Sequence, residues 1–589
     1  MFTRAASRVA RLVTPRPITA PHNLSRLIII RPIHQPSAPP TSLLPKLIVN
    51  RSTAIAASAF ATAGLARLIL APPTSAIAAP PPQAPPDQLV RSLDKIAAQD
   101  GKVRTALRVL WRCLQLLFFL APVLCTLPLL RTPLRARWLR SLVNTLERCG
   151  PVGIKWGQWA STRYDIFEDD LCDALGALTN AAPVHPIEWS RKVFRDEIGK
   201  ELEEVFDNFS PSPIASGSIG QVHTATLKHA HGPDMPKGLK VAVKIQHPNL
   251  AERLGIDMAI LMGAADAVGS IKGLQVNDTV AQFASNFYMQ LDFRDEAENL
   301  RRFRRHFASG FWRAIVSFPT PVDDLVSQHV VVETFEKGES VAEYLHKAGD
   351  SPKVTKWRRE GTKWVPVDPS LALENNVKDG DDLELRKKVA LCGVQSYLKM
   401  LMMDNFIHAD LHPGNVLVRM EEADWIARLQ RWLLIGQTGA RVPHIVFLDA
   451  GLAASFNTTI YSNVQGFFES IIKFDGPTFG KAILGLAPTQ PYVKSPQTFI
   501  EEVTAKMGEQ REEMLNGEGR AGDNIRAYMA SVRAHNVKLD PTVMVALMSM
   551  LVLEGWQFRL DPSTSIVGAI ETQLDRRSSL AGWLISFAR

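Results

Sequence analysis

The segment HADLHPGN at residues 408–415 contains side chains that could ligate a metal ion or transfer a phosphoryl group. In one interpretation His408, Asp410 and His412 bind a single metal ion, with the two histidines at the i, i+4 spacing of an H-x-x-x-H zinc site. In the other, Asp410 orients or deprotonates an acceptor group and Asn415 holds a Mg²⁺ ion, as in a phosphoryl-transfer loop. The proline and glycine before Asn415 disfavour the helix that a zinc site of this kind uses. The spacing therefore favours phosphoryl transfer over zinc.

A second oxygen ligand is expected from Asp449, which ends the apolar run HIVFLDAGLA and comes before Gly451. This order matches the D-x-G element whose aspartate binds Mg²⁺ between nucleotide phosphates. Carboxylate and amide oxygens are hard ligands that suit Mg²⁺. We predict that Asn415 and Asp449 bind the metal and that Asp410 and Asn415 are catalytic.

A small-residue loop, ASGSIGQV at 215–222, comes directly before a strand pattern. It matches the nucleotide-loop pattern G-x-G-x-x-G-x-V with Gly217, Gly220 and Val222, while Ala215 replaces the first glycine. Small residues are needed there because a Cβ obstructs the approach of the backbone to phosphate oxygens. A plain hairpin turn would have a similar composition. The predicted nucleotide-binding residues of the loop are Ala215, Ser216, Gly217, Ser218, Ile219, Gly220 and Val222.

Lys244, in the β-type tetrapeptide VAVK, is expected to reach the nucleotide phosphates from a strand. It needs a carboxylate to position it, and Glu296 lies on the strongly helical stretch LDFRDEAENLRRF. A surface lysine and an unrelated helix glutamate are the simpler alternatives for each residue alone. Because loop, lysine, D-x-x-x-x-N and D-x-G follow one another in the right order, we predict a kinase-like site. Lys244 is its third catalytic residue and also binds nucleotide, together with Glu296 and Glu333.

The elements that must hold these residues change type along the chain. Helical patterns extend to about residue 211, strand patterns follow at 220–227, 240–246 and 329–335, and helical patterns then return. Strands first and helices later in one body predict an α+β protein. We expect a protein-kinase-like bilobal fold, with a small β-rich N-lobe and a larger helical C-lobe.

Together these segments resemble the UbiB, or aarF-domain (ABC1-type), family of atypical kinases, in its mitochondrial branch related to coenzyme Q. H-x-D-L-H-P-G-N is that family's loop, and the resemblance spans roughly residues 140–565. Upstream, GIKWGQ supplies Lys155 and Gln158 of the family's K-x-G-Q motif, which share one face of a helix. The resemblance implies a helical K-x-G-Q extension at 132–210 that folds over the active site. Lys155 and Gln158 would point into the site as regulatory residues.

Two positions depart from the family pattern. The family's loop is alanine-rich, A-A-A-S, whereas Gly217 stands in the middle of this one. The glycine should ease phosphate approach and shift the preference between ATP and ADP. The family's E-x-D element reads Gln290, Leu291, Asp292, so one carboxylate near the nucleotide or metal is lost.

The resemblance implies an atypical kinase or ATPase that uses ATP or ADP with Mg²⁺ at the mitochondrial inner membrane. It would support the biosynthesis or distribution of coenzyme Q (ubiquinone), or mitochondrial lipid homeostasis. The expected partners are adenine nucleotide, a membrane lipid or quinone, and proteins of the coenzyme Q pathway. Because no A-P-E element follows Asp449, we do not expect a protein kinase. The alternative is a pseudokinase, or a lipid-binding module, that regulates its partners without phosphoryl transfer.

The net charge of +8 comes from the N-terminal leader. Residues 1–86 contain nine Lys or Arg and no Asp or Glu, whereas residues 87–589 hold 58 basic and 59 acidic side chains. The body is nearly neutral, which argues against nucleic-acid binding. An Arg-, Ser- and Ala-rich start without acids is typical of a mitochondrial transit peptide, with a disordered basic tail as the alternative. The five cysteines form no CxxC pair, so neither zinc nor a disulfide framework is indicated.

An uncharged stretch at 113–130 is just long enough to cross a hydrocarbon core. Pro122 and Pro128 favour a kinked span or a helix lying in the membrane interface. Basic residues flank both ends, so the orientation stays open. The segment ADWIARLQRWLLIG could touch a membrane or pack on the helical lobe. The late helix DPTVMVALMSMLVLEGW is expected to start at Asp540 and end before Gly555. It is too short to span a bilayer, so it is either a buried helix or the wall of a lipid groove.

The predicted domain order follows from these patterns. It comprises a transit peptide at 1–40, an Ala/Pro-rich linker at 41–103, a transmembrane or membrane-associated helix at 104–131, the extension at 132–210, the N-lobe at 211–340, and the C-lobe at 341–589 with insertions at 350–388 and 419–443.

Overall fold

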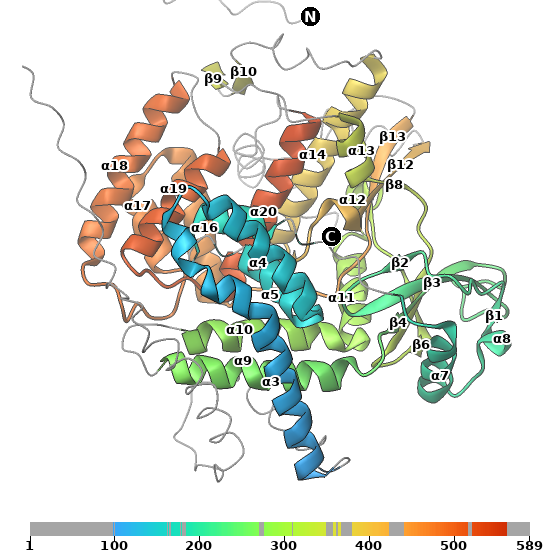
Figure 1. Cartoon of the computed structure of the whole chain (residues 1–589). Helices are drawn as coiled ribbons and strands as arrows, with labels where there is room; N and C mark the ends of the chain where they lie inside the picture. Colours follow the sequence, from blue (N-terminus) through green and yellow to red (C-terminus); the bar gives the residue numbers. More distant parts are fainter. Residues whose placement is uncertain are drawn as a thin grey trace, which may run out of the picture. The chain divides into compact units, whose positions relative to one another are not determined.

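The computed structural model describes residues 98 and 101–561, except for 162, 164–166, 177, 179–183, 270–275, 309, 349–356, 361–362, 367–379, 423–440 and 516–520. All described elements belong to one structural unit, residues 59–589 (Figure 1). The predicted transit peptide and the segment ADWIARLQRWLLIG lie outside the described residues.

An antiparallel six-stranded sheet forms the β-rich lobe. Its order is β1-β3-β4-β7-β6, and β2 also pairs with β3. The strands are β1 (Phe206–Asp207), β2 (Ala215–Ser216), β3 (Gly220–Leu227), β4 (Lys240–Gln246), β6 (Pro321–Val326) and β7 (Val330–Thr334). Valine-rich strands bury one face against α7 (Ile187–Ile198) and α8 (Leu202–Val205), in a core that includes Phe194, Val241 and Val243. The three strand patterns expected from the sequence are confirmed as β3, β4 and β7.

Three helices follow β4. α9 (Leu250–Gly269) and α10 (Val276–Tyr288) lie side by side, and α11 (Phe293–His306) packs against β6 and β7 (Figure 1). α11 begins at Asp292 because that side chain accepts a hydrogen bond from the backbone N–H of Arg294. Its apolar face, including Ala297 and Leu300, is buried. The helix is therefore fixed in position beneath the sheet.

The second lobe is mostly helical around a large apolar core. Its helices are α12 (Gly310–Arg313), α13 (Val341–Ala348), α14 (Gly380–Met402), α16 (Thr458–Lys473), α17 (Gly476–Leu484), α18 (Pro496–Leu515), α19 (Ala521–Ala534) and α20 (Pro541–Leu560). α14 and α20 pack together at its centre. Asp540 caps α20 by accepting a hydrogen bond from the backbone N–H of Thr542.

Short strands link the segments that carry chemistry in this lobe. A four-stranded sheet has the order β5-β13-β12-β8, with β5 (Val316–Ser317), β8 (Glu339–Ser340), β12 (Val416–Glu422) and β13 (Arg441–Phe447). β11 (Ile407–His408) pairs with β14 (Ala453–Ala454). A separate hairpin joins β9 (Trp357–Glu360) and β10 (Lys363–Pro366).

A helical segment precedes the β-rich lobe. It contains α3 (Lys102–Cys125), a 3-10 turn at Leu127–Arg131, α4 (Arg135–Cys149), α5 (Pro151–Ser161) and α6 (Asp169–Leu175). α3 contacts α4 and α9, and α5 contacts α9 and α10. We call α4, α5 and α6 the extension.

The α+β, kinase-like bilobal fold class is confirmed, but several boundaries differ from the expectation. α20 continues through Gly555 to Leu560, because a helix-interior glycine costs only about 1 kcal/mol and the residues beyond it are buried. α14 already begins at Gly380, inside the predicted insertion 350–388. β12 and β13 pair as far as Glu422 and Arg441, so strands occupy both ends of the predicted insertion 419–443. β1 lies within the stretch expected to be helical up to residue 211.

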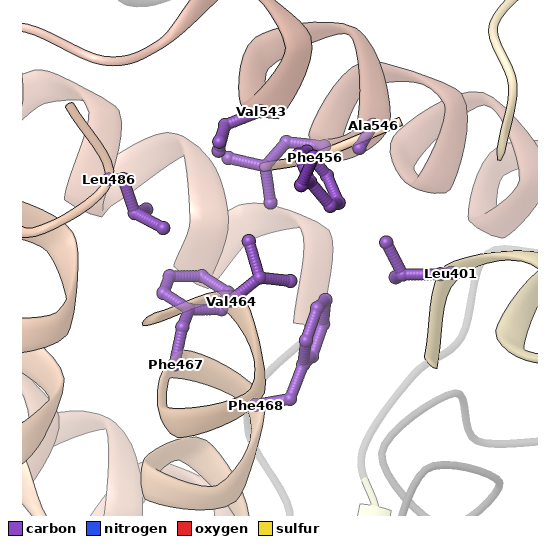
Figure 2. A pocket seen from close by; sticks show the side chains of 9 residues that line it. Leu401, Phe456, Val464, Phe467, Phe468, Leu486, Val543 and Ala546 are labelled. Carbon is purple, nitrogen blue, oxygen red and sulfur yellow. The ribbon is translucent and has the colours of Figure 1, made fainter. Parts of the chain in front are cut away.

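An apolar cavity lies beside α20 in the core of the helical lobe (Figure 2). It measures about 10 Å³ and is lined by Leu401, Phe456, Val464, Phe467, Phe468, Leu486, Val543, Ala546 and Leu547. Pockets that hold small molecules are usually about 300–1,000 Å³. This cavity is a packing gap and not a lipid groove, and α20 is a buried core helix at this place.

Candidate functional site

Lys244, Glu296 and Asp449 come together although they lie far apart in the sequence. Lys244 Nζ is 2.8 Å from both carboxylate oxygens of Glu296 and 3.4 Å from Asp449 Oδ2. The side chains of Lys244 and Glu296 are 17% and 4% exposed, whereas that of Asp449 is 39% exposed. The structure thus brings three predicted site residues into one cluster with the aspartate on its open side.

Strand alternation explains the direction of the lysine. Val243 and Ile245 on β4 are fully buried in the core of the β-rich lobe. Because successive side chains on a strand point to opposite faces, Lys244 points away from that core. There it meets Glu296, which is on the buried face of α11. The fold therefore fixes both partners of the pair through regular elements.

The charged groups of the cluster shift one another's pKa values. Burial raises the pKa of Glu296 to about 7, although Lys244 opposes the rise. Burial and the charge of Glu296 raise the pKa of Glu333 well above its usual value. Burial alone would lower the pKa of Lys244, but the carboxylates of Asp449 and Glu296 outweigh it and raise that pKa. The lysine stays charged among an excess of carboxyl groups.

A tight turn holds Asp449. Its Oδ1 accepts a hydrogen bond of 2.8 Å from the backbone N–H of Gly451, and Asn299 Nδ2 donates to the carbonyl of Ala450 at 2.9 Å. Burial opposes ionisation of Asp449, but Lys244 and the N–H of Gly451 outweigh it and lower the pKa. An ionised carboxylate at the end of β13 is the group that a divalent cation binds.

The loop at 408–415 is locked beside Asp449. The backbone N–H of Asp410 donates to His408 Nδ1 at 3.2 Å. Asn415 Nδ2 lies 3.5 Å from the carbonyl of Asp410, and the carbonyl of Asn415 accepts from Leu448 N–H at 2.9 Å. The last bond joins Asn415 to the residue before Asp449. Asp410 and Asn415, predicted as catalytic, are therefore neighbours in space.

The predicted nucleotide loop is the β2–β3 hairpin. Gly217 N–H donates to the carbonyl of Gly220 at 2.9 Å and closes the turn. A Cβ at Gly220 would lie 2.5 Å from the carbonyl oxygen of Ile245, so glycine is required by the adjacent strand. Among the described residues, the backbone N–H groups of Ser218 and Ile219 have no protein acceptor. These two donors at the tip are available to an anionic ligand.

The extension carries the two predicted regulatory residues on α5. The positive charge of Lys155 contributes to the lowered pKa of Asp449, after burial, Lys244 and other neighbours. Gln158 Nε2 donates to the carbonyl of Leu178 at 3.4 Å, within the extension's own surroundings. The glycine of the motif also has a packing role, because a Cβ at Gly157 would lie 2.1 Å from Leu178 Cδ1.

The residues of the site fit a magnesium nucleotide. Ser216 Oγ and Glu333 Oε2, both on predicted nucleotide-binding residues, are buried without a hydrogen-bond partner in the described part of the chain. Buried polar atoms are normally bonded, so such atoms suit the polar groups of a ligand. Asn415 directs its amide nitrogen to a protein carbonyl, which leaves its oxygen to join the Asp449 carboxylate as a hard ligand. Among the described residues there is no group of three His, Cys, Asp or Glu side chains arranged for another metal.

Two residues near the site were missed at the sequence level. Asn299 lies three positions after Glu296 on the same helix and holds the turn of Asp449. His247 comes just after β4, and its Nε2 lies 2.8 Å from the carbonyl oxygen of Gly217. Asn299 could have been found from its helical spacing to Glu296, and His247 from its place directly after the strand that carries Lys244.

Comparisons with known proteins show the family to which this chain belongs. Residues 177–481, just over half of the chain, match the ABC1 atypical kinase-like domain. A mitochondrial ABC1 family protein of Schizosaccharomyces pombe is 26% identical over 543 residues, covering 81% of this chain and 72% of that protein. The probable protein kinase UbiB of Marinobacter nauticus is 30% identical over 277 residues, covering 46% and 43%. A solved Rv3197–erythromycin complex from Mycobacterium tuberculosis aligns with 67% of this chain and 83% of its own, at 18% identity and a TM-score of 0.43. The motifs, their order and the matched domain together establish that this chain belongs to the ABC1 atypical kinase-like family.

Proposed function

We propose that the protein binds ATP or ADP with Mg²⁺ and acts as an atypical kinase or ATPase. The observation that carries this proposal is that carboxylate oxygens of Glu296 and Asp449 both lie within 3.4 Å of Lys244 Nζ. Asp410 and Asn415 lie beside this cluster. Phosphoryl transfer needs such a set: a positioned lysine, oxygen ligands for magnesium, and a base near the acceptor.

Each residue has a separate task in this proposal. Asn415 and Asp449 would hold Mg²⁺, which when bound neutralises phosphate charge. Lys244 presents a fixed positive charge to phosphate oxygens, and Glu296 sets its direction through two hydrogen bonds. The backbone N–H groups of Ser218 and Ile219, which have no acceptor among the described residues, would donate hydrogen bonds to phosphate oxygens. Asp410 accepts the proton of the attacking hydroxyl group or water.

The proposed acceptor is a small molecule or lipid rather than a protein. The sequence after Asp449 has no A-P-E element, and the extension brings the charge of Lys155 close enough to lower the pKa of Asp449. Relatives are named as mitochondrial and as UbiB. We infer a role at the mitochondrial inner membrane in the biosynthesis or distribution of coenzyme Q, or in lipid homeostasis. Partners would be a membrane lipid or quinone and proteins of that pathway.

The surface of α3 supports a membrane location. Lys102–Arg131 is, among the described residues, the segment long and apolar enough to cross a membrane. The exposed large apolar side chains of α3 recur at helical spacing and form one stripe along the helix that contains no charged residue. They are Val103, Leu107, Leu110, Trp111, Leu114, Leu117, Phe118 and Leu124, all among the exposed large apolar residues. Such a stripe, with both Trp111 and Phe118 more than 70% exposed, suits the acyl boundary of a bilayer.

The opposite face of α3 favours a helix that lies in the membrane plane. Arg112 makes a two-pronged ion pair with Asp257 of α9, with distances of 2.6 and 2.9 Å. Near the other end, Trp138 Nε1 donates to the carbonyl of Val123 at 3.0 Å, and Val123 is buried. A spanning helix would have to break both attachments and carry Arg112 toward lipid, which is costly. Of the two alternatives left open by the sequence, we propose the interfacial one.

The test of the enzyme proposal is ATP turnover by the purified protein with cardiolipin-containing vesicles and a quinone-precursor mimic. We expect Asp410→Asn to lower turnover at least about 100-fold while nucleotide binding persists, since the change removes a general base. Asp449→Asn should lower both turnover and magnesium-dependent binding. Asp207→Asn, at an exposed position on β1, is the matched control. Equal turnover in all four proteins would overturn the enzyme proposal.

A pseudokinase is the second candidate, because one observation favours it. The positive charge of Lys155 contributes to the lowered pKa of Asp449, and a cation near this carboxylate would oppose the binding of a metal ion there. Nucleotide binding that shifts the extension without any turnover, in the wild type and in Lys155→Met, would support this candidate over the enzyme.

A further inference from the structure

A chain of hydrogen-bonded side chains connects the nucleotide loop with the start of α7. Its members are His185, Ser190, Gln221, His223 and His247, which we call the histidine relay. His185 is 6% exposed, Ser190, Gln221 and His223 are fully buried, and His247 is half-buried at the loop. Ser190 lies on α7, and Gln221 and His223 lie on β3. His185 precedes α7 and His247 follows β4, and none of the five was predicted as a site residue from the sequence.

The direction of each bond in the first half of the relay follows from one carbonyl group. Gly217 O can only accept, so His247 Nε2, at 2.8 Å, must carry the hydrogen. A neutral His247 then has a lone pair on Nδ1, which must accept from His185 Nδ1 at 2.8 Å. His185 in turn has its lone pair on Nε2 and accepts from the hydroxyl group of Ser190 at 2.9 Å. One arrangement of hydrogens satisfies all three bonds.

The second half of the relay anchors His185 to β3. His223 Nδ1 donates to the carbonyl of Ser210 at 2.8 Å, which leaves Nε2 to accept from Gln221 Nε2 at 3.0 Å. The amide of Gln221 also donates to the carbonyl of His185 at 3.2 Å and accepts from its backbone N–H at 2.9 Å. The backbone and ring of His185 are therefore both fixed.

Neutral rings are required throughout, and their surroundings keep them neutral. Burial and, after it, the neighbouring His247 and His223 lower the pKa of His185 to about 4. Burial also lowers the pKa of His223 and of His247. The groups that bond to these rings are the other histidines, the Ser190 hydroxyl group, the Gln221 amide and backbone carbonyls, and among the described residues no carboxylate bonds to them.

We propose that His247 is a positioning residue for the nucleotide loop, and that His185 ties this loop to the start of α7. His247 contacts the loop twice, because its backbone N–H also donates to the carbonyl of Ile219 at 2.9 Å. In a trans peptide the C=O and the N–H point in opposite directions. Holding the carbonyl of Gly217 against His247 therefore turns the N–H of Ser218, at the loop tip, away from His247. His185 lies two residues before the first residue of α7 and bonds to Ser190 within that helix. A shift of α7 would act on the loop through His185 and His247.

This inference rests on the proposed nucleotide site, and its test separates the two. The first measurement needs no nucleotide: amide hydrogen exchange in the peptide 215–222 of the full chain. We expect faster exchange in His247→Phe and in His185→Phe. His247→Gln keeps an amide donor for Gly217 O and should restore slow exchange. His229→Gln, at an exposed histidine outside the relay, should leave exchange unchanged.

The second measurement is the Kd of ADP, determined by titration calorimetry. We expect His247→Phe to raise Kd about three- to tenfold, as for the loss of one hydrogen bond, and His247→Gln to recover most of it. The double variant with His185→Phe should bind no more weakly than His247→Phe alone, because His185 acts through His247. Thermal melting of each variant shows whether it is folded.

The possible results have distinct meanings. Unchanged exchange in His247→Phe would overturn the relay, whether or not nucleotide binds. Faster exchange with an unchanged Kd in a wild type that does bind would also overturn it. Absence of ADP binding by the wild type would overturn the proposed function, while the exchange data would still decide whether His247 positions the loop.

Discussion

Two glycines in the nucleotide loop should respond in opposite directions to the same substitution. At Gly217 the nearest atom to an added Cβ would be the carbonyl oxygen of Gly220 at 3.8 Å, and φ is not positive. Alanine fits there, so Gly217→Ala should raise the free energy of unfolding by about 0.4–1 kcal/mol through the unfolded chain. At Gly220 a Cβ would lie 2.5 Å from the carbonyl oxygen of Ile245 and 3.2 Å from the Cα of Gln246. Gly220→Ala must displace the backbone of β4, at a cost of about 1–3 kcal/mol.

The displaced strand is the one that carries Lys244, so the two variants should also differ in binding. Gly220→Ala should weaken the binding of ATP and ADP together, because it moves the lysine. Gly217→Ala should change the ratio of the two affinities with little change in stability, because its methyl group faces the loop turn. Urea denaturation followed by circular dichroism gives the stabilities, and calorimetry gives the affinities. A loss of more than 1 kcal/mol in Gly217→Ala, or equal effects of both substitutions, would refute the steric reasoning.

Three further predictions address the site, its pH response and the core. Glu296→Gln removes the carboxylate that bonds Lys244 through both of its oxygens, and it should weaken nucleotide binding about tenfold. Glu298→Gln, at a side chain that is 59% exposed on the same helix, should not weaken binding. Titration calorimetry of the two variants compares their affinities. Burial and neighbouring histidines lower the pKa of His185 from 6.5 to about 4, so the unfolded chain binds that proton more readily. The contribution of neutral His185 to the free energy of unfolding should therefore be fully present above about pH 6.5, and the free energy should fall by up to about 3 kcal/mol as the pH drops to 4. The fall should be smaller in His185→Gln, when the midpoints of urea denaturation are compared. A Cβ at Gly393 would lie 2.4 Å from the indole of Trp556, so Gly393→Ala should lower the melting temperature by several degrees in a thermal scan.

The parts of the site that could be predicted from sequence are those set by one element or by a fixed spacing. Lys244 was predictable because strand alternation alone decides which way it points once its neighbours are buried. Asp410 and Asn415 were predictable because one short loop carries both, and Asp449 because a strand and a glycine bracket it. The α+β class followed from the change of hydrophobic period along the chain.

The rest depends on distant segments that meet, which no local pattern encodes. His185, His223 and His247 each look ordinary in the sequence, and the pairing of β3 with β4 together with the packing of α7 on β4 brings them close. The ends of elements were also poorly determined. Gly555 signals a helix end by composition, yet the helix continues because the next turn is buried against the core. In such places tertiary packing overrides the local preference.

The extension is held to the two lobes by contacts of different chemical kinds, and this difference decides how it can move. On one side, Val152 of α5 joins an apolar cluster with α9 and α10. On the other, α6 meets α19 through surface ion pairs, Arg533 with Asp169 at 3.4 Å and Arg526 with Asp173 at 3.5 Å. Exposed pairs are typically worth about 0–1 kcal/mol and weaken with salt, whereas apolar burial does not. High ionic strength should therefore release α6 from α19 before α5 leaves α9. Because Lys155 lies on α5, its charge would continue to act on Asp449, the proposed metal ligand, even when α6 separates from α19.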